Sequence, residues 1–174
     1  ELRRPLERWL KKNDVSVHTG SLAKGATVGS DGVTLSWENA LGEEQSIVVD
    51  KVLVTVGRSP NSRGWGLENM GVRMAEGGRF VAIDKQCKTN MSRVYAIGDL
   101  AGEPMLAHKA SAQGEMVAEI ISGAAREWDK VAVPAIVFTE PELVTVGLSP
   151  EEAEANGEAI IIGKFPLAAN GRAL

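Results

Sequence analysis

Apolar and polar positions follow different periods in successive stretches of the chain. Near the start, Leu2, Leu6, Trp9 and Leu10 recur at helical spacing, and two lysines follow where they complement the dipole of a helix. This pattern predicts a short amphipathic helix. The next runs predict short strands at residues 15–19, 21–28, 33–38 and 45–49.

The last three of these strands are expected to form an antiparallel β-meander. Asp31 and Gly32 give a strong hairpin signal between the first two, because such a turn needs positive φ at its centre. Residues 41–44 (Leu-Gly-Glu-Glu) separate the second strand from the third. We therefore expect a meander inserted after a helix and a strand.

Residues 51–56 (Lys-Val-Leu-Val-Thr-Val) have a different character. They are nearly all apolar and β-branched, as expected for a strand that is covered on both faces. The run ends at Gly57, and loops that leave the carboxyl end of such a strand are where open α/β sheets hold ligands. A plain turn is the alternative, and the local pattern alone favours it.

The rest of the chain mixes short strands with two helices. Residues 106–121 place Leu, Ala, Gln, Val and Ile side chains on one helical face, and this helix is expected to end near Gly123. Ser149, Pro150 and Glu152 form a capping box with proline at the first helical position, which predicts a second helix. Further strands are predicted at residues 79–83, 93–97, 135–138, 143–146 and 159–165. The fold class is α/β.

Charge and cysteine usage restrict the possible partners. The net charge of −4 argues against a nucleic-acid surface, which needs a clustered basic face. No apolar run approaches the roughly 20 residues of a membrane span, so no membrane partner is expected. Cys87 is the single cysteine, which fits a reducing, cytoplasmic compartment. The chain opens directly on a helical pattern without Met, and we expect an internal segment of a longer protein.

The most informative stretch is residues 94–99 (Val-Tyr-Ala-Ile-Gly-Asp), shortly before residues 105–110 (Met-Leu-Ala-His-Lys-Ala). An apolar strand brings Asp99 to its carboxyl end directly after Gly98, which would let a ligand approach the backbone closely. An ionised carboxylate only accepts hydrogen bonds, so sugar hydroxyls are its natural partners. The following helix starts nearby with free N–H groups and a positive dipole end. A flavin, with its ribityl chain and a ring that is anionic when reduced, suits such a site.

Each of these residues also has a structural interpretation. Asp99 is equally compatible with a cap of a turn or helix. A single histidine in the first turn of a helix, such as His108, more often contacts backbone or solvent than takes part in chemistry. Met105 and Leu106 are compatible with an ordinary core.

Several motifs together resemble a known family. In order and spacing, the chain is similar to the dihydrolipoamide dehydrogenases, members of the flavin- and pyridine-nucleotide-dependent disulfide oxidoreductases. The Gly-Asp motif is shared across that wider family, whereas residues 105–110 are specific to this branch. Residues 102–105 and 112–119 resemble the form associated with branched-chain 2-oxoacid dehydrogenase complexes. The resemblance rests on residues 54–61, 95–99, 104–110, 138–142, 146–147 and 169–173.

The resemblance implies three regions. Residues 1–57 would be the C-terminal part of a Rossmann-like NAD-binding domain that carries the meander. Residues 58–130 would be the central FAD-contacting domain, and residues 131–174 the start of an α+β interface (dimerisation) domain. The resemblance also implies a homodimer.

The same resemblance implies the sites of both cofactors. Asp99 would bind the ribityl–phosphate part of FAD. The segment Met105, Leu106, Ala107 and His108 would lie along the flavin, with the helix N-terminus directed at the pyrimidine edge of the ring.

On the nicotinamide side, Gly57 would let NAD pass close to the backbone. Ala23 would match a backbone contact to NAD.

The family's catalytic groups are not in this sequence, so no catalytic residue is assigned. The resemblance implies oxidation of dihydrolipoamide on a lipoyl domain through a Cys-x4-Cys disulfide and FAD, with reduction of NAD and a His–Glu pair as base. Cys87 does not match the redox pair, and both glycine-rich dinucleotide fingerprints are missing. The chain alone is therefore expected to be inactive. The alternatives are another flavin disulfide reductase or a transhydrogenase, and a non-catalytic nucleotide-binding or interaction module.

Overall fold

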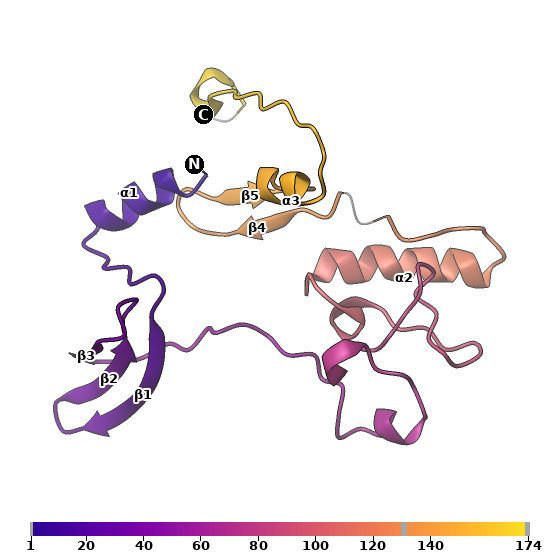
Figure 1. Cartoon of the computed structure of the whole chain (residues 1–174), viewed down its shortest axis with the longest axis horizontal. Helices are drawn as coiled ribbons and strands as arrows, with labels where there is room; N and C mark the ends of the chain where they lie inside the picture. The colour runs from indigo at the N-terminus through magenta and orange to yellow at the C-terminus, as the bar shows by residue number, and fades with distance from the viewer. Residues whose placement is uncertain (1, 130–131, 173–174) are drawn as a thin grey trace.

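The chain forms small folded units that are joined by extended segments (Figure 1). This computed structural model describes residues 2–129 and 132–172. The expected boundary between residues 130 and 131 and the end of the 169–173 motif lie outside the described residues. Within the described residues, no helix has both the length and the apolar character needed to cross a membrane.

The first element is helix α1, Arg4–Lys12, which confirms the predicted amphipathic helix. A proline lies in its first turn, and Lys11 and Lys12 lie in its last turn beside the free carbonyl groups. The strand predicted at residues 15–19 is wrong, because this stretch is irregular. A strand needs a hydrogen-bonded neighbour, and none of the described strands pairs with these residues.

The predicted β-meander is confirmed. Strands β1 (Leu22–Gly29), β2 (Gly32–Glu38) and β3 (Glu44–Val49) form an antiparallel sheet in the order β1-β2-β3. Gly32 closes the first hairpin with φ +131°, and a Cβ there would lie 2.6 Å from the carbonyl oxygen of Val49. The sequence needs glycine at this turn for both reasons.

The strand predicted at residues 51–56 is wrong in this structure. The segment crosses from the meander to the central unit as an extended chain without ladder partners among the described residues (Figure 1). Leu53 and Val56 are 87% and 90% exposed. A strand that is covered on both faces needs strands on its flanks and layers above and below, and the described part of the chain does not place them there.

The central unit holds two small apolar clusters. Leu67, Val81 and Ala96 form one, and Cys87 packs with Met116 and Val117 of helix α2 (Ala107–Ile121) in the other. Helix α2 is confirmed as predicted. The strands predicted at residues 79–83 and 93–97 are wrong, because each is reduced to one bridge, Met74↔Val81 and Lys88↔Tyr95. Short 3-10 turns connect these parts at Leu67–Asn69, Glu76–Gly78 and Gly98–Ala101.

The final unit contains a two-stranded antiparallel sheet and a short helix. Strands β4 (Ala135–Val137) and β5 (Leu143–Thr145) confirm two predicted strands, and helix α3 (Pro150–Ala155) has the predicted capping box. The strand predicted at residues 159–165 is wrong, because the segment is exposed and unpaired within the described residues. A last 3-10 turn spans Leu167–Ala169. The described residues thus combine helices with antiparallel strands, in keeping with the predicted α/β class and its meander.

Candidate functional site

Gly98 begins the corner that carries the candidate acid. It has φ +66°, and its N–H donates a 2.7 Å hydrogen bond to Oε1 of Gln113 in α2. A Cβ at Gly98 would lie 2.9 Å from the Cβ of Ala110. The absence of a Cβ at Gly98 therefore lets α2 pack closely against the corner, and the expected close approach of a ligand stays a prediction.

Gln113 was not predicted as part of this corner. The sequence pattern places it on the apolar face of α2, and its side chain is indeed inside, only 3% exposed. The sequence offered one signal for this contact, a polar residue on an otherwise apolar helical face. A buried amide needs hydrogen-bond partners, so such a residue indicates a polar contact inside the fold.

Asp99 lies in the 3-10 turn Gly98–Ala101 at the surface of the central unit. Its Oδ2 accepts a 3.2 Å charged hydrogen bond from Nη2 of Arg58, and its side chain is 35% exposed. The described residues give it no backbone N–H partner, so the alternative interpretation as a cap does not hold. The carboxylate keeps its second oxygen, Oδ1, outside this ion pair and at a partly open surface.

Arg58 is a second residue of this corner that the sequence analysis does not predict. It follows Gly57 at the carboxyl end of the apolar segment 51–56, the position where the sequence indicates a ligand loop. An arginine beside a glycine in such a loop is a recognisable signal for an acidic partner. Its pairing with Asp99 brings residues 41 positions apart in the chain to one place.

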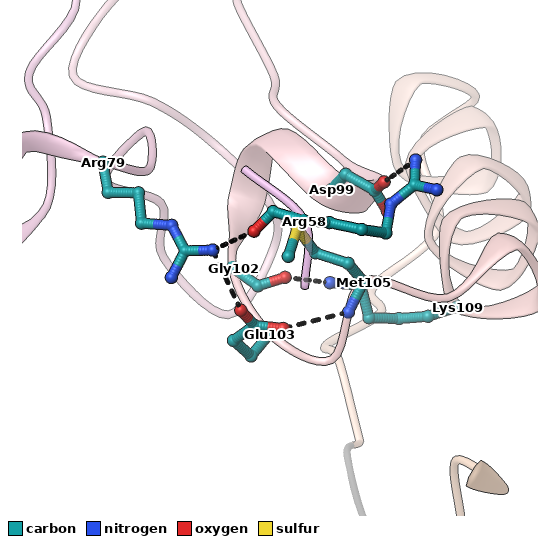
Figure 2. A network of polar contacts seen from close by, with 7 residues as sticks. All are labelled: Arg58, Arg79, Asp99, Gly102, Glu103, Met105 and Lys109. Atoms are coloured by element: carbon teal, nitrogen blue, oxygen red, sulfur yellow. Dashed lines mark hydrogen bonds and ion pairs between the residues drawn. The ribbon is translucent and has the colours of Figure 1, made fainter. Parts of the chain in front are cut away.

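The amino end of α2 lies close to this corner (Figure 2). Its N-cap residue, Leu106, makes no side-chain capping hydrogen bond, so the first N–H groups of the helix are left to outside acceptors. Met105 and Leu106 are half-buried, whereas Ala107 and His108 are exposed. Nε2 of His108 donates to the carbonyl oxygen of Pro134 at 2.8 Å, which matches the structural alternative of a backbone contact.

A set of polar contacts ties the surrounding loops together. Figure 2 shows Arg79 donating to the backbone carbonyl of Arg58 and facing Glu103, whose Oε1 lies 3.6 Å from its guanidinium. Oε2 of Glu103 accepts the N–H of Met105 at 3.2 Å. Lys109 is buried and donates to the carbonyl oxygen of Gly102.

The two predicted nicotinamide-side residues lie in different places. Gly57 has φ +110°, and no atom lies within 4 Å of the position of a Cβ, so its backbone is open to a ligand. It directly precedes Arg58 and is thereby linked to Asp99. Ala23 lies in β1 opposite Trp37, in the meander that Figure 1 shows apart from the central unit. The structure does not bring Ala23 to the Asp99 corner.

A cleft of about 1080 Å³ lies between the central unit and the β4–β5–α3 unit. Glu103, Lys109 and Gln113 line it, but Asp99 and Met105 do not. Asp99 and the segment from Met105 to His108 therefore lie outside the lining of this cleft. Within the described residues, no group of three His, Cys, Asp or Glu side chains is placed to hold a metal ion.

Comparison with known protein families identifies the family of the chain. Residues 1–114 match the model of the pyridine nucleotide-disulphide oxidoreductase family. The chain belongs to this family. Residues 133–174 match the dimerisation domain of pyridine nucleotide-disulphide oxidoreductases, and members of the family use FAD and NAD.

Individual relatives are similar to this chain over most of its length. It is 49% identical to a dihydrolipoyl dehydrogenase of Pseudomonas aeruginosa, over 100% of this chain and 36% of the relative. The relative from Bacillus subtilis is 48% identical, over 96% of this chain and 35% of that protein. The chain thus spans about a third of the length of these curated relatives.

Solved structures of the family superpose well on the chain. LpdA from Mycobacterium tuberculosis has a TM-score of 0.82 at 27% identity, covering 99% of this chain and 37% of that one. The flavoprotein disulfide reductase RclA from Escherichia coli has a TM-score of 0.78 at 24% identity, covering 96% and 38%, which shows the shared fold.

Proposed function

We propose that this chain is part of a dihydrolipoyl dehydrogenase, which oxidises protein-bound dihydrolipoamide through a redox disulfide and FAD and reduces NAD. Relatives of that name are 47% to 49% identical over 96% to 100% of the chain. Bound FAD would supply the electron transfer between the disulfide and the nicotinamide. The chain itself would supply binding and orientation.

The observation that carries the proposal is the position of Asp99 beside the uncapped amino end of α2. Oδ1 of Asp99 is available to accept hydroxyl groups of the ribityl chain, while Arg58 holds Oδ2. Met105, Leu106, Ala107 and His108 would lie along the flavin. The free N–H groups and the helix dipole of α2 would stabilise negative charge on the pyrimidine edge of the ring. The residues present therefore fit an FAD site.

NAD would be bound at Gly57, the residue that directly precedes Arg58. Gly57 is open on the side where a Cβ would stand, which supports a close backbone approach by the dinucleotide. Ala23, exposed on the edge strand β1, would contribute a backbone contact to NAD.

The same family membership supports a domain division, a homodimer and a protein partner. We assign residues 1–57, 58–130 and 131–174 to the NAD-binding, FAD-contacting and interface domains. The match to a dimerisation domain supports a homodimer. The protein partner would be the lipoyl domain of a 2-oxoacid dehydrogenase complex, of the branched-chain type. The lone Cys87 supports a reducing, cytoplasmic location.

The test uses the full-length protein that carries this chain. We expect it to purify with FAD and to reduce NAD when dihydrolipoamide is added. Substrate scope is compared by offering glutathione disulfide and NADPH as the alternative pair. A protein that binds no flavin, or one that uses only the alternative pair, would contradict the proposal.

A further inference from the structure

Arg79 lies between two loops of the proposed FAD site, the loop after Gly57 and the loop before α2. It follows the 3-10 turn Glu76–Gly78, and its guanidinium carbon lies 5.0 Å from the centre of the Phe80 ring. From there Nη2 donates to the backbone carbonyl of Arg58 and pairs with Glu103 (Figure 2). One side chain thus contacts both the loop after Gly57 and the loop before α2.

Each of the two partners of Arg79 also contacts a residue of the proposed FAD site. Arg58 is held through its backbone, which leaves its side chain to bind Oδ2 of Asp99 at 3.2 Å. Glu103 uses Oε1 for Arg79 and Oε2 for the N–H of Met105. Arg79 is therefore connected to both ends of the proposed flavin site, the acid and the segment that leads into α2.

These contacts suit a positioning role better than a stabilising one. The side chains of Arg79 and Glu103 are 46% and 55% exposed, and ion pairs at such surfaces contribute little to folding. A single guanidinium nitrogen carries two N–H groups, and Nη2 of Arg79 uses this capacity to reach both the carbonyl oxygen of Arg58 and the carboxylate of Glu103. A lysine supplies the charge, but from a nitrogen on a different side-chain geometry.

We propose that Arg79 is a positioning residue for FAD, acting through Arg58 on Asp99 and through Glu103 on Met105. This inference rests on the proposed function. When Arg79 is removed, the loop after Gly57 and the loop before α2 lose their common partner. The acceptor at Asp99 and the helix end should then no longer be held at the separation that the ribityl chain and the ring require.

The test is titration of full-length apoprotein with FAD, followed by flavin fluorescence. Arg79→Gln is expected to raise the Kd for FAD roughly 3- to 10-fold, the loss of about one charged contact. Arg79→Lys should restore part of the affinity. Arg73→Gln is the matched control, because Arg73 is an exposed arginine of the same unit whose described contacts are made by its backbone. It should leave the Kd unchanged.

Two further readouts separate positioning from a structural role. The effects of Arg79→Gln and Glu103→Gln on the Kd should be non-additive, because the two residues act through one contact. The visible spectrum of bound flavin should change in Arg79→Gln, while thermal unfolding of the apoprotein matches that of Arg73→Gln.

The outcomes are distinguishable. Equal Kd and equal spectra for Arg79→Gln and Arg73→Gln would overturn the inference and leave the proposed function standing. A loss of affinity that follows a lowered unfolding temperature and is not restored by lysine would overturn it as well. Failure of the wild-type protein to bind FAD would overturn the proposed function and the inference together.

Discussion

At the scale of single residues, the candidate site could be predicted in part. The structure places Asp99 close to the start of α2, as expected from an acid and a helix start that follow each other closely in sequence, and their cofactor contacts stay predictions. The contact of Arg58 with Asp99 could not be predicted, because it depends on how a distant loop folds back. The close packing of Gly98 against Ala110 could not be predicted either, because it depends on tertiary structure.

Replacement of Asp99 should weaken FAD binding more than folding. Asp99→Asn keeps the size and one acceptor oxygen but removes the charge that Arg58 pairs with, so we expect the Kd for FAD to rise roughly 10- to 100-fold. Titration of the full-length apoprotein measures it. Asp31→Asn, in the exposed hairpin, is the matched control. An unchanged Kd for Asp99→Asn would remove this acid from the site.

Replacement of Gly98 should act on folding. Gly98→Ala must adopt φ +66° and places a Cβ 2.9 Å from that of Ala110, so a loss of about 1–3 kcal/mol in the free energy of unfolding is expected. Denaturant titration measures it. Gly114→Ala is the control within α2, where the added methyl would meet only Ile97 at 3.5 Å and alanine favours the helix. Equal stability of the two variants would contradict the packing explanation.

At the scale of elements, local signals predicted well and long-range pairing did not. The meander, α1, α2 and the capping box of α3 each depend on residues close in sequence, and all four are confirmed. The strands expected at residues 51–56, 79–83 and 159–165 are wrong because a strand exists only beside another strand. An apolar run indicates where a strand can form but does not supply its neighbour.

The capping box of α3 should make this helix sensitive to acid. Hydrogen bonds from the backbone N–H and then the side chain of Ser149 lower the pKa of Glu152 from 4.5. The folded helix therefore gains from the charged carboxylate above about pH 4.5, and this gain is lost as the pH falls through the lowered value.

Hydrogen exchange of the α3 amides can test this pH dependence. Glu152→Ala should exchange faster than Glu151→Ala at pH 7, because both remove a first-turn acid but only Glu152 closes the capping box. The difference should shrink when the pH is lowered well below 4.5. A difference that persists in acid would show that the carboxylate charge is not its source.

At the scale of the whole molecule, the chain combines recognisable cofactor elements with little shared core. The folded units contribute separate small clusters, and apolar side chains such as Leu53, Val56, Ile161 and Phe165 are exposed. The family and fold class could be predicted from short motifs. The packing between regions could not, since it depends on parts that the described residues do not bring together.

The chain of 174 residues, purified alone, should transfer no electrons from dihydrolipoamide to NAD. The reason is chemical: its single cysteine cannot form the intramolecular disulfide through which the electrons would pass. The measurement is NADH formation with added FAD, and the full-length protein is the positive control. Turnover by the isolated chain would refute this division of roles.

The hydrogen bond from the Gly98 amide to Gln113 has a consequence for how the loop before α2 can vary. Sliding the helix by one residue would set Ala112 or Gly114 against that amide, and neither side chain offers an oxygen. An insertion or deletion between residues 99 and 106 is therefore compatible with the corner only if the loop absorbs it and the helix keeps its rotational setting. The rotational setting of α2 should therefore tolerate less change than the length of the loop before it.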